Sequence, residues 1–147
     1  MRLARCLVVV AAVTALGGCV VPARDDAAYR TDAAQALQSA TSETRTAELV
    51  LQHWLSGSVT RAYADTVVTD SEKALGPIQT SFGGVDPPNR GADPLREDVT
   101  GQLSDAESAL AEARIALRRG DAPAVQQVVT DLTKVADQLE KTGEGLR

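Results

Sequence analysis

Aromatic side chains are scarce in this chain of 147 residues, at 3% of the composition: Tyr29, Trp54, Tyr63 and Phe82. So few rings exclude an aromatic-rich β-sandwich and a surface that stacks nucleobases. The formal charge of −5 argues further against nucleic acid as a partner. Charged residues at 24% and a mean hydropathy of −0.12 exclude a polytopic membrane protein and a wholly disordered chain. The length suits one domain with a modest core.

Residues that carry chemistry are equally rare. His53 is the only histidine, and no carboxylate stands at the Glu-x-x-His spacing of di-iron helical bundles. No methionine follows Met1, which excludes a thioether copper site. The chain also lacks a Gly-rich phosphate loop, a nucleophile elbow and a paired-cysteine motif. We therefore expect neither an enzyme nor a bound metal or cofactor.

The first nineteen residues form the clearest pattern in the chain. Arg2 and Arg5 precede an apolar run over residues 7–16, which as a helix would span roughly 15 Å of a ~30 Å hydrocarbon core. That length is too short for a transmembrane helix and typical of a signal peptide. The run ends in Leu16-Gly17-Gly18-Cys19, which resembles the lipobox of bacterial lipoproteins. An ordinary secretory signal with a chance cysteine is the alternative.

The lipobox resemblance implies a covalent anchor on Cys19. In that family the cysteine sulfur receives a diacylglyceryl group and the chain is cut before it, so residues 1–18 would be the signal peptide. Cys6 would leave with the signal, and the mature chain would have no disulfide. Loss of Arg2 and Arg5 leaves 13 basic against 20 acidic residues, a charge of −7. We therefore expect the lipid, not charge, to hold the protein on the outer face of the cell membrane.

Apolar residues recur at helical spacing in four segments that follow a lipidated tether at 19–25. The predicted helices run over residues 26–56, 59–82, 94–119 and 122–142. Together they predict an all-α, up-down-up-down four-helix bundle over 26–142, with a flexible tail at 143–147. A pair of hairpins that buries its apolar faces only on dimerisation is the alternative. The protein would then be a monomer or a homodimer.

Glycine, proline and capping residues set the predicted boundaries. Gly57 should take a left-handed conformation, and Ser58 should cap the second helix. Pro77 should kink or break that helix near Gly76, because a proline in a helix interior costs about 3 kcal/mol. Asp93 should cap the third helix.

The spacing of the second helix predicts a buried face. Its members recur four residues apart, as one side of a helix does: Val59, Tyr63 and Val67.

Antiparallel order places these elements relative to the membrane. The turns at Gly57 and Gly120 should lie far from the lipid, and the loop 83–92 should lie near it. The candidate partner-binding residues are His53, Trp54, Arg118 and Arg119 at the distal end and Phe82 facing the headgroups. Each also has a purely structural interpretation: a polar helix end, a core plug, or ion pairs and dipole complementarity for the arginines.

Taken whole, the chain resembles small helical lipoproteins of actinobacteria that are rich in alanine and arginine. The segments 42–49 and 61–66 carry that resemblance, together with twelve arginines against three lysines. The resemblance implies a location and no activity. We therefore expect a non-enzymatic interaction or structural module of the cell envelope, with an envelope protein or the cell wall as partner. The alternative is a lipoprotein that holds a small apolar ligand between helices, near Trp54 or Tyr63.

Overall fold

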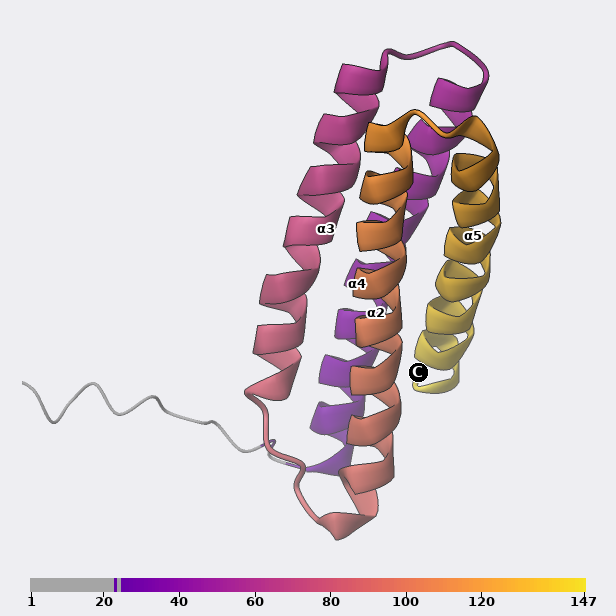
Figure 1. Cartoon of the computed structure of the whole chain (residues 1–147). Helices are drawn as coiled ribbons and strands as arrows, with labels where there is room; N and C mark the ends of the chain where they lie inside the picture. Colours follow the sequence, from indigo (N-terminus) through magenta and orange to yellow (C-terminus); the bar gives the residue numbers. More distant parts are fainter. Residues whose placement is uncertain (1–22, 24) are drawn as a thin grey trace, which may run out of the picture.

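The computed structural model describes residue 23 and residues 25–147, so the predicted signal peptide and Cys19 lie outside the described part. Four helices make up most of that part: α2 (Asp26–Leu55), α3 (Arg61–Gly83), α4 (Asp93–Arg119) and α5 (Ala122–Gly145). A short 3₁₀ helix, η2 (Arg90–Ala92), precedes α4, and the described residues contain no strand. Figure 1 shows the four helices side by side and antiparallel. The predicted all-α four-helix bundle is confirmed.

Each helix packs beside its neighbours in the sequence, and the two terminal helices close the bundle. α2 contacts α3 and α5, α4 contacts the same two helices, and α2 also touches α4 across the diagonal. The turns 56–60 and 120–121 lie together at one end, which we name the hairpin end (Figure 1). The start of α2 and the loop 84–92 lie at the opposite, loop end. The two turns therefore share one end of the bundle, as the antiparallel order predicts.

The apolar stripes predicted for α2, α4 and α5 line the core. In α2 the repeat from Leu37 through Ala40, Thr44 and Ala47 to Leu51 is fully buried. Trp54, at the end of the α2 stripe, is half-buried. Most members of the other two stripes are buried as well, and the half-buried exceptions are Leu95 in α4 and Val135 in α5. The spacing of apolar residues therefore identified the inner faces of three helices correctly.

The buried face predicted for α3 is wrong by one position. Tyr63 is 57% exposed, and the buried residues are Ala64, Val68, Ser71, Leu75 and Phe82. Ala64, one position after Tyr63, is fully buried in that row. A tyrosine on the seam would instead have to bury its hydroxyl, which is costly without a hydrogen-bond partner.

Pro77 does not break α3. The helix is continuous from Arg61 to Gly83 with the proline inside it. Pro77 and Lys73 are both exposed, so the Lys73 carbonyl that loses its N–H partner lies on a face that water reaches. Of the two outcomes predicted near Gly76, a kink or a break, the break is not observed.

The first hairpin turn differs from its prediction at the cap of α3. Gly57 does take the left-handed conformation, with φ +75°, as does Gly120 with φ +67°. Thr60, not Ser58, caps α3, and its hydroxyl accepts a hydrogen bond from the Tyr63 N–H at 3.2 Å. Ser58 instead closes the preceding turn, where its N–H donates to the His53 carbonyl at 2.8 Å.

The start of α4 also differs from its prediction. Asp93 is the first helical residue, not the cap, and Ala92 occupies the cap position without a side-chain hydrogen bond. The reason is η2, which continues directly into α4. Asn89 caps η2 instead, accepting from the Gly91 N–H at 2.8 Å.

The predicted tail at 143–147 continues α5 through Gly145. Gly143 is buried, and a Cβ added there would lie 3.6 Å from the Leu37 Cβ. The Arg30 guanidinium donates to the Gly145 carbonyl at 3.2 Å, and the Arg147 guanidinium donates to the Gln38 amide oxygen at 2.9 Å. Gly143 therefore does not end α5. Its missing side chain lets α5 approach α2 at Leu37.

The packing of α4 gives a stability prediction. Replacement Leu110→Ala should lower the free energy of unfolding by about 3 kcal/mol, because it opens a cavity in the closed core. Urea unfolding followed by circular dichroism measures the change. The matched control is Leu49→Ala, since Leu49 is 56% exposed and Leu110 fully buried. Equal losses in the two variants would contradict the buried assignment.

Candidate functional site

Two of the predicted contact residues lie in the last turn of α2, at the hairpin end. His53 is exposed, and its backbone carbonyl accepts hydrogen bonds from the Ser58 N–H and, at 2.9 Å, from the Ser56 hydroxyl. Trp54 is half-buried and packs against the core. His53 is thus open to a partner, whereas much of the indole serves to close the core.

The arginines of α4 bind carboxylates of α3. Arg114 makes a two-point contact with Glu72, at 2.5 Å and 3.1 Å, and the hydrogen bond to this carboxylate raises the pKa of the guanidinium. Arg118 pairs with Asp65 at 2.7 Å. These contacts support the structural interpretation of both arginines. Arg119 is exposed, and no side-chain partner is found for it within residues 25–147.

Phe82 is not a surface residue. It is 4% exposed and its ring centroid lies 5.6 Å from that of Tyr29, inside the loop end of the bundle. A side chain held in this way cannot contact lipid headgroups, so the predicted role of Phe82 is wrong. Phe82 lies seven positions after Leu75, two helical turns further along the same buried face of α3.

Tyr29 carries a buried polar group that the sequence did not reveal. Its side chain is fully buried, and its hydroxyl has no hydrogen-bond partner among the described residues. Burial raises the pKa of this hydroxyl, against the opposing effect of the Arg96 charge. The ring buries apolar area and contacts Phe82, and an unpaired buried hydroxyl reduces stability.

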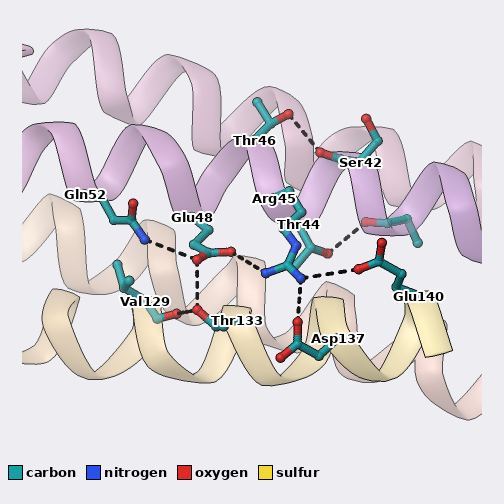
Figure 2. A network of polar contacts seen from close by, with 11 residues as sticks. Ser42, Thr44, Arg45, Thr46, Glu48, Gln52, Val129, Thr133, Asp137 and Glu140 are labelled. Atoms are coloured by element: carbon teal, nitrogen blue, oxygen red, sulfur yellow. Dashed lines mark hydrogen bonds and ion pairs between the residues drawn. The ribbon is translucent and has the colours of Figure 1, made fainter.

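A polar network joins α2 to α5 along one side of the bundle, and Figure 2 shows it from close by. The Arg45 guanidinium lies among three carboxylates, of Glu48 at 3.0 Å, Asp137 at 2.5 Å and Glu140 at 3.5 Å. Hydrogen bonds to Glu48 and Asp137 raise the pKa of Arg45. The network thus holds the two terminal helices in register.

Glu48 is the innermost member of this network, with a side chain 13% exposed. One of its oxygens accepts hydrogen bonds from the Gln52 amide at 3.1 Å and from the Thr133 hydroxyl at 2.9 Å (Figure 2). The other oxygen is bound to Arg45. Both oxygens of this carboxylate are therefore engaged within the bundle. Thr133 lies 85 positions from Glu48 in the sequence, and Asp137 lies 92 positions from Arg45, so no local spacing could reveal the contacts between α2 and α5.

The described residues offer neither a metal centre nor a membrane span. No three side chains of His, Cys, Asp or Glu come together among them in a way that could hold a metal ion. None of the described helices combines the length and apolar character needed to cross a membrane. Tyr63 points to solvent, and Trp54 is part of the core edge, so their placement gives no support to a ligand cavity between helices.

The surface includes an open groove of about 300 Å³ between α2 and α3, toward the loop end. Pockets for small molecules usually occupy ~300–1,000 Å³ and bury most of the ligand. This groove lies at the lower limit of that range and is open along its side. It is lined by Asp32, Gln35, Ala36, Ser39, Pro77, Ile78, Ser81, Phe82 and Val85.

Comparisons with known proteins found no relative. No protein-family model matches the chain, and neither a curated protein nor a solved structure is significantly similar to it.

The buried hydroxyl of Tyr29 gives a pH-dependent prediction. Tyr29→Phe should raise the free energy of unfolding at pH 7 by about 1 kcal/mol, because it removes an unsatisfied buried group. The folded-state pKa lies above the ordinary value of 10.0, so above pH ~10 the unfolded chain ionises first and the wild type loses stability. The free energy of unfolding of Tyr29→Phe should fall less than that of the wild type over that pH range. Urea unfolding at pH 7 and between pH 9 and 11 measures both effects.

The control for this prediction is Tyr63→Phe. These are the only two tyrosines, and Tyr63 is 57% exposed, so its replacement should leave both the stability at pH 7 and the alkaline decline unchanged. An unaltered alkaline decline in Tyr29→Phe would show that the hydroxyl is hydrated.

Proposed function

We propose that the protein is a lipid-anchored, extracytoplasmic lipoprotein whose helical bundle is a non-enzymatic interaction or structural module of the cell envelope. The observation that carries the proposal is the pattern at the start of the chain: Arg2 and Arg5, an apolar run, and Leu16-Gly17-Gly18-Cys19. Cys19 would carry the lipid, whose two acyl chains are the number needed for a stable anchor.

The arrangement of the bundle is compatible with an anchor at this place. α2 begins at the loop end, only seven positions after Cys19. Ala23 packs against the core there, and its N–H donates to the Asp86 carbonyl at 3.3 Å. A lipid on Cys19 would therefore hold the loop end toward the membrane. The hairpin end would lie up to about 45 Å away, the length of a 30-residue helix such as α2.

The hairpin end is the surface we assign to the partner. Exposed side chains of His53 and Arg119 lie there, together with Tyr63, a large apolar residue that is 57% exposed. Rings and guanidinium groups are enriched at protein interfaces.

The anchor is tested by Cys19→Ser. Loss of the sulfur that receives the lipid should move the protein from the membrane fraction to the soluble fraction or block its maturation, as measured by fractionation and by mass spectrometry of the N-terminal peptide. Cys6→Ser is the matched control and should leave membrane attachment intact, because Cys6 belongs to the predicted signal. Unchanged membrane retention of Cys19→Ser would exclude lipid attachment at this residue.

The partner surface is tested by photo-cross-linking in native membranes. A cross-linking residue at position 53 or 119 should capture a defined protein or cell-wall fragment. The same residue at position 100, which is exposed on α4 nearer the loop end, should capture severalfold less. Recovery of lipid alone from all three positions would contradict an interaction module that works through its hairpin end.

A further inference from the structure

The groove between α2 and α3 has the chemistry of a surface that holds a short extended segment. Its floor is apolar, with Ala36, Ile78 and Phe82, and its lower end is Val85. Polar side chains stand along its rim: Asp32, Gln35, Ser39 and Ser81. An apolar floor with polar groups beside it suits a strand whose side chains point inward and whose backbone groups meet the rim.

The chain that precedes α2 is attached next to this groove. The Ala23 N–H donates to the Asp86 carbonyl at 3.3 Å, and Ala23 packs against the core. Asp86 directly follows Val85, the lower end of the groove. The residues before Ala23 therefore start from the groove's edge.

Those residues are apolar, unlike a freely hydrated linker. The tether reads Cys19-Val20-Val21-Pro22, without the glycine and serine typical of flexible linkers. We propose that Val20 and Val21 lie in the α2–α3 groove and strap the tether to the bundle. An extended chain advances up to ~3.6 Å per residue, so these two valines reach roughly 7–11 Å from Ala23, which is sufficient to enter the groove beyond Val85.

The strap gives the protein a defined posture. A free tether would let the bundle swivel on its lipid, whereas a tether held in the groove limits the directions in which the loop end can face the membrane. That consequence rests on the proposed lipid anchor. The docking itself does not, because it concerns only contacts within the chain.

Paired cysteines test the docking without the lipid. The full chain carrying Cys6→Ser and Cys19→Ser has no other cysteine, so Val21→Cys combined with Ser81→Cys forms one candidate disulfide. The matched control combines Val21→Cys with Thr100→Cys, since Thr100 is exposed on α4, outside the groove. Under mild oxidation the first pair should form at least about fivefold more intramolecular disulfide, because the bond requires Cα atoms within roughly 7 Å. Gln35→Cys replaces Ser81→Cys if the helical signal of that variant is lost.

Three results would overturn the strap. Equal disulfide formation in the two pairs would mean a freely moving tether, and formation in neither would place Val21 away from the groove. Disulfide-linked dimers would assign the groove to a second copy of the chain. None of these results bears on lipid attachment, which the fractionation of Cys19→Ser decides separately.

Discussion

Close approach of α2 to the other three helices is the constraint on which the bundle depends. The inner face of α2 consists largely of small side chains, with Ala33, Ala40, Thr44 and Ala47 fully buried. Such a seam lets α2 touch α4 across the diagonal as well as its two neighbours. Small residues bury little area each, so the stability must come from closeness and from the leucines of α4 and α5 that fill the remaining space.

Arginine complements this seam at the edges of the bundle. Arg45 bridges α2 and α5, whereas Arg114 and Arg118 bridge α4 and α3. The planar guanidinium can engage two oxygens at once, as Arg114 does with Glu72, and lysine cannot reproduce this geometry. Partly exposed pairs of this kind add little free energy each. Their main effect is to fix the axial register of helices whose small-residue faces could otherwise slide.

The spacing of residues along the sequence predicted those parts of the fold that depend on neighbouring residues alone. The stripes of α2, α4 and α5 and the left-handed Gly57 follow from periodicity and backbone sterics. The prediction for the buried face of α3 was wrong because Tyr63 and Ala64 are adjacent in the sequence. Which of the two is buried depends on the space between α3 and its neighbours, and that space takes the smaller residue. The helix continues through Pro77 because the Lys73 carbonyl that the proline leaves without an N–H partner lies on an exposed face.

For the candidate site at the hairpin end, the sequence predicted only which residues lie at that end of the bundle. Antiparallel order brought His53 and Arg119 to one end, as expected. The pairing of Arg45 with Asp137 joins positions 92 apart in the sequence, and the burial of Tyr29 and Phe82 depends on how three elements meet at the loop end. Such features arise from tertiary contacts, which a single sequence does not encode in any nearby spacing.

The closure of the bundle by its two terminal helices has a kinetic consequence. Three of the four neighbouring contacts join helices that follow one another in the chain, and such local pairs form quickly. The fourth, between α2 and α5, must wait until the last helix is available. In a chain synthesised from its N-terminus, the side of α2 that contacts α5 would therefore stay exposed until α5 has formed. Docking of α5 would then complete the bundle in one late step.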